Sequence, residues 1–130
     1  MAKGTFASVL FVSSDARAHM PPGSVSELIT QAAAFGIEVQ EVDSQVDTRN
    51  TVEEARHSNT RIVGFFGYSE QDIPGLDAAT KCGGLALTPG GSASLWCTRR
   101  EGRSFPIGRH LEVRRPADAI LALQSAIAGG

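Results

Sequence analysis

The stretch FASVLFVSS, residues 6–14, decides the fold class of this chain. It is a continuous apolar run closed by two serines, rather than an alternation of apolar and polar residues. A strand with one face in water alternates, whereas a strand covered by helices on both faces is apolar throughout. The run therefore predicts a buried strand of an α/β sheet, and RIVGFFG, residues 61–67, predicts another. IEVQEV, residues 37–42, alternates in part and predicts a third strand.

Helical patterns separate these strands. SVSELITQAAAFG, residues 24–36, has apolar residues at helical spacing, and TVEEARHSN, residues 51–59, reads as a shorter helix. Each begins on a capping box, in which a hydroxyl and a carboxylate three residues apart satisfy free backbone amides: Ser24 with Glu27, and Thr51 with Glu54. DARAHMPPG, residues 15–23, reads as a loop. The alternation of strands and helices predicts a sheet with helices on its faces.

The second half of the chain continues the pattern. Four stretches follow in order: a helix over 72–84 that Asp72 caps and Gly83 stops, a short strand in 85–91, a hairpin whose strands flank Glu101-Gly102, and a closing helix over 115–130. Since no linker or repeat interrupts the chain, we expect a single α/β domain over residues 1–130.

Composition narrows the classes of function. The chain has 42% hydrophobic and 20% charged residues, which is ordinary for a soluble globular protein. No run of about 18 apolar residues occurs, so we expect no membrane span. Cys82 and Cys97 form neither a disulfide framework nor a CxxC pair, and the three histidines show no metal-ligand spacing. We therefore expect a reducing compartment, the cytoplasm, with no metal and no cofactor.

Charge is unevenly distributed along the chain. Residues 1–80 carry 5 basic and 11 acidic side chains, whereas residues 81–130 carry 7 basic and 3 acidic ones. The basic excess is nearly all arginine, including Arg99, Arg100 and Arg103. An arginine cluster on an otherwise acidic protein predicts contact with phosphate or nucleic acid. The alternative is a solvated hairpin face with no ligand.

The stretch LWCTRREGRS, residues 95–104, raises a catalytic alternative. Cys97 and Arg103 have the spacing of a cysteine-dependent phosphatase loop, in which a helix begins near the arginine and its amides bind the phosphate. Pro106 and Gly108 fall where that helix would have to form. The hairpin therefore explains these residues better, and we expect no enzymatic activity.

The ordered set of motifs resembles the C-terminal anticodon-binding domain of class II aminoacyl-tRNA synthetases of the threonyl, prolyl, histidyl and glycyl group. The motifs that carry the resemblance are VLFVSS (9–14), DTRN (47–50), RIVGFFGYSE (61–70), LWCTRREGRSFPIG (95–108) and DAILALQSAI (118–127). The resemblance implies a mixed five-stranded sheet with helices on both faces and a C-terminal hairpin and helix. It also implies a non-catalytic domain that binds tRNA or another structured RNA.

The resemblance implies roles for particular residues. Asn50 matches the loop asparagine and Glu70 the strand-end glutamate that read anticodon bases in threonyl-type domains, while Cys97 stands where that family has an arginine. Beside these, the arginines Arg49, Arg99, Arg100 and Arg103 are candidate contacts to RNA phosphates. An insertion over residues 71–91 departs from the family pattern.

Two alternatives stay open beside the RNA hypothesis. Asn50 is also suited to cap a helix, and Glu70 to be a solvated acid at a strand end. The same fold also suits a protein-interaction adaptor in a larger complex. Overall acidity favours the adaptor, because domains that contact phosphates are usually positively charged.

Overall fold

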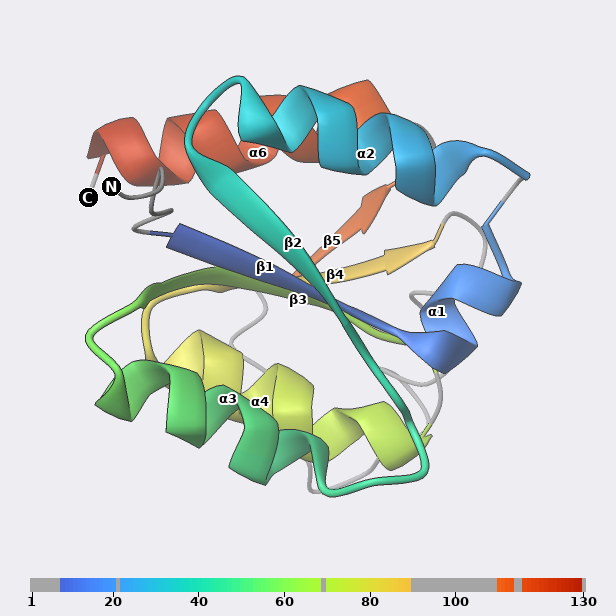
Figure 1. Cartoon of the computed structure of the whole chain (residues 1–130), viewed down its shortest axis with the longest axis vertical. Coiled ribbons are helices and arrows are strands. Elements are labelled where there is room, and N and C mark those ends of the chain that lie inside the picture. The colour runs from blue at the N-terminus through green and yellow to red at the C-terminus, as the bar shows by residue number, and fades with distance from the viewer. Residues whose placement is uncertain (1–7, 21, 69, 90–109, 114–115, 130) are drawn as a thin grey trace.

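Parallel strands form the centre of the structure. The computed structural model describes residues 8–20, 22–68, 70–89, 110–113 and 116–129 of the chain (Figure 1). The strands follow the order β2-β1-β3-β4-β5, with bounds β1 Ser8–Ser13, β2 Ile37–Val42, β3 Arg61–Phe66, β4 Leu85–Pro89 and β5 His110–Val113. The helices are α1 Ser14–Ala18, α2 Ser24–Ala33, α3 Thr48–His57, η1 Glu70–Asp72 (a 3-10 turn), α4 Ile73–Lys81 and α6 Pro116–Gly129. The predicted α/β class is therefore confirmed.

The mixed sheet is not observed among the described strands. Every described pairing is parallel, between β1 and β2, β1 and β3, β3 and β4, and β4 and β5. A parallel pair needs a crossover connection, usually a helix, whereas a hairpin makes an antiparallel one. Helices α2, α3 and α4 supply that crossover between the first four strands. The hairpin around Glu101-Gly102 lies outside the described residues.

Strand β1 is buried on both faces, as its continuous apolar run predicts. Leu10 and Val12 belong to a core under α2 and α6, and Val9 and Phe11 belong to a second core under α3 and α4. The alternation follows from the two-residue period of a strand. Figure 1 shows α2 and α6 on one side of the sheet, with α3 and α4 on the other.

Two predicted capping boxes are wrong. Helix α2 begins after Gly23, whose φ of 84° makes a left-handed turn, so Ser24 lies inside the helix and no side chain caps it. Helix α3 begins three residues earlier than expected, because the Asp47 side chain caps it by accepting a hydrogen bond from the Asn50 amide. Aspartate is a favoured N-cap, so Asp47 was the available signal.

The predictions for two further helices have different outcomes. The stretch after β1 was expected to be a loop, but α1 forms there because the Ser13 hydroxyl accepts from the Ala16 amide. The helix over 72–84 is confirmed as α4, and Gly83 follows it with a φ of 91°. Asp72 takes the N-cap position, yet its side chain does not cap the helix. No helix of the described part is long and apolar enough to cross a membrane.

Candidate functional site

The carboxyl ends of β1 and β3 meet where the strand order reverses. The chain leaves β1 for β2 on one side and later returns to place β3 on the other side. In open α/β sheets, such a switch point opens a crevice at the carboxyl ends of the strands, and ligands bind there. The segments that follow β1, β2 and β3 converge at this edge of the sheet (Figure 1).

Asp72 occupies the switch point and is fully buried. Its Oδ2 accepts from the Ser13 hydroxyl at 2.6 Å and from the Tyr68 amide at 2.8 Å, while its Oδ1 accepts from the Ser44 hydroxyl at 2.8 Å. A buried carboxylate is costly unless hydrogen bonds satisfy it, and these bonds supply that satisfaction. The carboxylate therefore joins the ends of three strands.

The serines around Asp72 also bond to the backbone. The Ser44 hydroxyl accepts from the Asp15 amide at 3.1 Å, and the Ser44 amide donates to the Ser14 hydroxyl at 2.9 Å. These reciprocal bonds tie the start of α1 to the loop after β2. The double serine that closes the first apolar run was the available sequence signal for this network, which sequence reasoning missed.

An aromatic pair lies at the same edge. The rings of His19 and Tyr68 stack with centroids 3.5 Å apart and planes 14° apart. The His19 Nδ1 lies 2.9 Å from the Asp15 carbonyl oxygen, which orients the ring. His19 is exposed, so the pair presents a flat side chain to solvent. Sequence reasoning missed the pair because the two residues are far apart in the chain.

The first turn of α3 lies against η1. The Thr48 hydroxyl donates to the Gln71 carbonyl at 3.3 Å and accepts from the Gly75 amide at 2.9 Å. These contacts bring the backbone around Asn50 and Arg49 close to the segment that Glu70 opens. Three of the sequence-predicted residues therefore come from neighbouring segments.

The side chains of the first turn of α3 already have partners. Asn50 donates to the Glu54 carboxylate at 3.2 Å, and it lies inside α3, so its alternative role as N-cap is wrong. Arg49 forms an ion pair with Asp77 at 3.7 Å, and Lys81 pairs with the same carboxylate at 3.1 Å.

The arginine-rich part of the predicted site is not described. Arg99, Arg100 and Arg103 lie outside the described residues, as does Cys97 of the phosphatase alternative. The structure therefore places only the α3 and η1 portion of the predicted RNA contacts.

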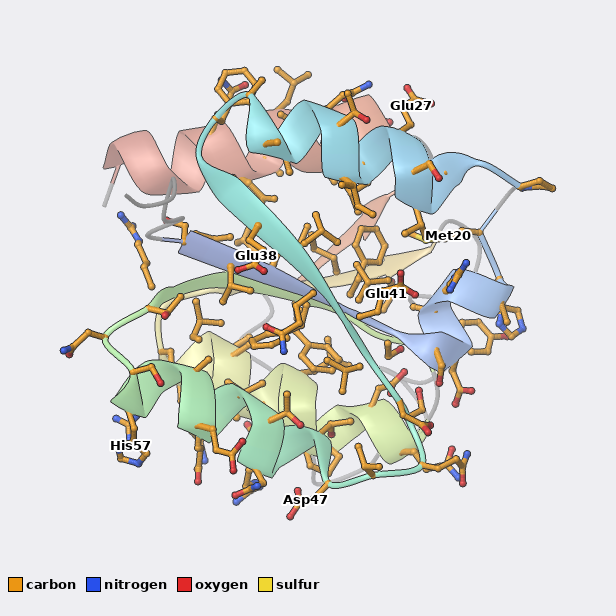
Figure 2. All side chains as sticks on the ribbon, in the orientation of Figure 1. Met20, Glu27, Glu38, Glu41, Asp47 and His57 are labelled. Atoms are coloured by element: carbon orange, nitrogen blue, oxygen red, sulfur yellow. The ribbon has the colours of Figure 1, made fainter. Side chains whose placement is uncertain are left out.

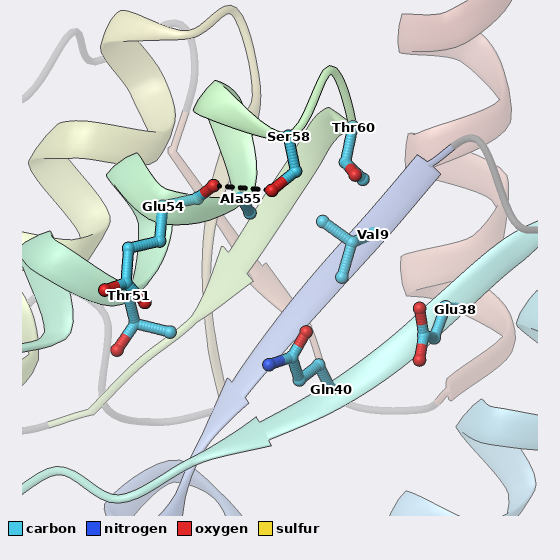
Figure 3. Close-up of a pocket in the computed structure, with 8 residues that line it drawn as sticks. All are labelled: Val9, Glu38, Gln40, Thr51, Glu54, Ala55, Ser58 and Thr60. Atoms are coloured by element: carbon cyan, nitrogen blue, oxygen red, sulfur yellow. Dashed lines mark hydrogen bonds between the residues drawn. The ribbon is translucent and has the colours of Figure 1, made fainter.

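A polar groove runs between α3 and β2, with a volume of about 260 Å³ (Figure 3). Its lining residues come from β1, β2, α3 and the turn after α3: Val9, Glu38, Gln40, Thr51, Glu54, Ala55, Ser58 and Thr60. The groove exists because α3 lies over β3 and against α4, while α2 covers β2 on the opposite face. The residues of β2 that face α3 are correspondingly polar at Glu38 and Gln40.

The groove is suited to a cation. Glu38 and Glu54 supply carboxylates, and the other polar groups of the described lining are one amide and three hydroxyls. Among the lining residues that the structure describes, none has a basic side chain. Val9 and Ala55 supply an apolar floor. Carboxylates bind guanidinium and ammonium groups through charge-assisted hydrogen bonds.

Comparisons with known proteins add no assignment. A scan against models of protein families, a search of curated proteins and a search of solved structures each found no match to this chain. Within the described ranges, no group of three or more His, Cys, Asp or Glu side chains is arranged to hold a metal ion. Cys82 is a half-buried free cysteine beside the core under α3 and α4. The geometry of the molecule therefore has to carry the functional argument.

Proposed function

We propose that this chain is a non-catalytic interaction domain that binds a basic segment of a partner protein in the groove between α3 and β2. The observation that carries the proposal is the lining of the groove, whose described residues include two carboxylates and no basic side chain. Residues 1–80, which supply all the lining residues that the structure describes, carry a net charge of −6. This field attracts cationic segments over a range of about 8–10 Å at ordinary salt.

The shape of the groove favours an arginine or lysine side chain. Such side chains place an apolar stem on apolar surface and keep the charged head among polar groups. In the groove, Val9 and Ala55 accept the stem, while Glu38 and Glu54 accept hydrogen bonds from the head. The amide of Gln40 and the hydroxyls of Thr51 and Thr60 add further acceptors.

The hydrogen bonds of Asp72 at the switch point support a non-catalytic role. The Asp72 carboxylate is buried and already accepts from Ser13, Ser44 and the Tyr68 amide. A general acid or base must reach a proton of the substrate, whereas this carboxylate is directed at groups of the protein itself. The same network stabilises the loops at the carboxyl edge, which is a structural task.

Binding of a fluorescently labelled oligo-arginine peptide tests the proposal. We expect micromolar binding that weakens about tenfold in the double variant Glu38→Gln/Glu54→Gln, the equivalent of about 1.4 kcal/mol. The matched control is Glu27→Gln/Glu53→Gln, which removes the same charge outside the groove and is expected to change affinity less than twofold. Equal weakening in both double variants, or no binding, would contradict the proposal.

RNA binding is the second candidate, and one observation favours it. The Thr48 hydrogen bonds hold the first turn of α3, with Arg49 and Asn50, against the segment that begins at Glu70. In this proposal Asn50 and Glu70 contact base edges, and the phosphates are contacted by Arg49, Arg99, Arg100 and Arg103.

Titration of a bulk tRNA pool at two salt concentrations separates the candidates. RNA binding predicts an affinity that falls steeply with salt and is lost in Arg99→Ala/Arg100→Ala. The groove proposal predicts that Glu38→Gln/Glu54→Gln impairs peptide binding and leaves tRNA binding no weaker. Absence of tRNA binding at low salt would remove the RNA candidate.

A further inference from the structure

The outer surface formed by α2, the turn after it and α6, here the α2/α6 face, carries three of the four large apolar side chains that are exposed in the described structure. Four large apolar side chains are exposed among the described residues: Ile29 (40%), Phe35 (50%), Val46 (53%) and Leu121 (63%). Ile29 belongs to α2, Phe35 to the turn that ends it, and Leu121 to α6. The two helices are in contact with each other, so these residues belong to one helical layer.

The α2/α6 face is also nearly free of charge. Glu27 is the single charged residue of α2, and Asp118 is the single one of α6. Exposed positions of α2 between and beyond these apolar residues are small or uncharged: Ser26, Thr30, Ala33 and Ala34. A solvated helix surface normally carries interspersed charges, and small residues allow another helix to approach closely.

From these observations we propose that the α2/α6 face binds a second copy of this chain and forms a two-fold dimer. Two copies of an acidic protein repel each other least where their surfaces carry the least charge. The face is the same on both copies, so a two-fold contact matches apolar residues of one copy with apolar residues of the other.

The direction of the helices favours this two-fold arrangement. Both α2 and α6 begin at the carboxyl edge of the sheet and run back across it (Figure 1). Glu27 and Asp118 therefore lie near the same end of the face, and Glu27 is labelled near the start of α2 in Figure 2. A two-fold axis that runs across the helices makes the helices of the two copies antiparallel. The acidic end of each copy then lies against the apolar end of the other, around Phe35, so the carboxylates of the two copies stay apart.

The size of the face predicts a weak dimer. At about 1.5 Å per residue, α2 is about 15 Å long and α6 about 21 Å long. With helices about 10 Å apart, the face measures roughly 400 Å² per copy, which is about half of a standard interface. We therefore expect a dissociation constant of about 10–500 μM, in the range of transient association.

Sedimentation velocity across a protein concentration range of about 10 μM to about 1 mM tests the dimer. The wild-type chain is expected to shift from monomer to dimer, and Leu121→Arg to remain monomeric throughout. Val46→Arg is the matched control, because Val46 has similar exposure but lies before α3. It is expected to dimerise like the wild type. Circular dichroism of each variant confirms that it is folded.

The dimer experiment can succeed or fail independently of the groove proposal. Because the groove lies on the other side of the sheet, Glu38→Gln/Glu54→Gln is expected to dimerise normally. Ile29→Arg is a second variant that is expected to abolish the dimer, and it serves if Leu121→Arg fails to fold. A wild-type chain that is monomeric at about 1 mM, or equal loss of dimer in Leu121→Arg and Val46→Arg, would overturn the inference.

Discussion

The two helical layers of this molecule rest on the same sheet in different ways. The α3/α4 layer combines apolar packing with buried polar contacts, in which Thr48 joins α3 to α4 and Asp72 joins the start of α4 to β1. The α2/α6 layer packs through apolar side chains such as Leu28 and Leu123, while the described side-chain hydrogen bonds of α2, donated by Thr30 and Gln31, stay within the helix. Polar contacts between elements therefore orient the first layer, and shape complementarity positions the second.

The outer surfaces of the two layers differ as well. Helix α3 carries Arg49, Glu53, Glu54, Arg56 and His57, whereas α2 carries one charged residue. The charged layer borders the polar groove, and the nearly uncharged layer presents three of the four large apolar side chains exposed in the described structure. Under the two proposals, the two faces of one sheet serve different contacts, with a cationic ligand on one side and a second copy on the other.

Removal of the Asp72 carboxylate is expected to have the largest effect. Asp72→Ala leaves the Ser13 hydroxyl, the Ser44 hydroxyl and the Tyr68 amide without their buried acceptor. We expect a loss of about 3–5 kcal/mol in the free energy of unfolding, measured by urea denaturation. Asp72→Asn keeps the shape and one acceptor oxygen, so it should recover part of this loss. A loss below about 1 kcal/mol in the alanine variant would show that the polar contacts do not anchor the layer.

The corresponding test of the α2/α6 layer is a substitution that leaves a cavity in its core. Leu28 is fully buried in the core under α2 and α6, so Leu28→Ala is expected to lower the free energy of unfolding by about 2–5 kcal/mol. The conservative change Leu28→Met should cost less than about 1.5 kcal/mol, because it conserves volume. If the methionine variant were as unstable as the alanine variant, apolar volume would not be what holds this layer.

Close packing of α3 against α4 is tested at Gly75. A Cβ at this position would lie 2.6 Å from Phe65 Cε2 and 2.8 Å from Thr48 Cβ. Gly75→Ala is therefore expected to destabilise by about 1–3 kcal/mol through overpacking, even though alanine favours helices. The double variant Gly75→Ala/Phe65→Leu relieves part of the clash and should be more stable than the sum of the two single variants predicts. Thermal unfolding of the four proteins measures this coupling, and strict additivity would contradict the packing argument.

The smallest effect is expected at the exposed charges of the α3/α4 layer. Arg49 and Asp77 are 3.7 Å apart, and the Arg49 side chain is half exposed. Arg49→Ala should change the free energy of unfolding by less than about 1 kcal/mol, and by less at high salt. Urea denaturation at two salt concentrations measures this difference. A larger, salt-independent loss would mean that the ion pair contributes to anchoring the layer.

The sequence predicted helices and strands well where the apolar residues recurred with a single period, that of a strand or that of a helix. The strand over residues 37–42 was predicted with its observed bounds, and the helix over 72–84 ended at the expected glycine. Apart from α1, which forms where a loop was expected, the errors lie at helix starts. Several candidate caps stand close together there, and the conformation of Gly23 and the side chain of Asp47 decide where α2 and α3 begin.

The candidate sites were less accessible to sequence reasoning. Asn50, Arg49 and Glu70 belong to segments that the fold brings together, but Thr48, which joins those segments, was not identified. The groove was missed because most of its lining residues look like ordinary solvent-exposed positions of α3 and β2. They line a cavity only because α3 lies over β3 and leaves the adjacent part of β2 uncovered.

The sequence by itself determined the α/β class, since apolar runs and helical stripes are local consequences of backbone geometry. Only the tertiary structure decided the parallel strand order, the partners of Asp72 and the groove. Ser13 and Ser44 meet Asp72 from 59 and 28 residues away, and no local period encodes such a meeting. These features depend on which side of β1 each returning strand joins, and that choice is made by packing between distant parts of the chain.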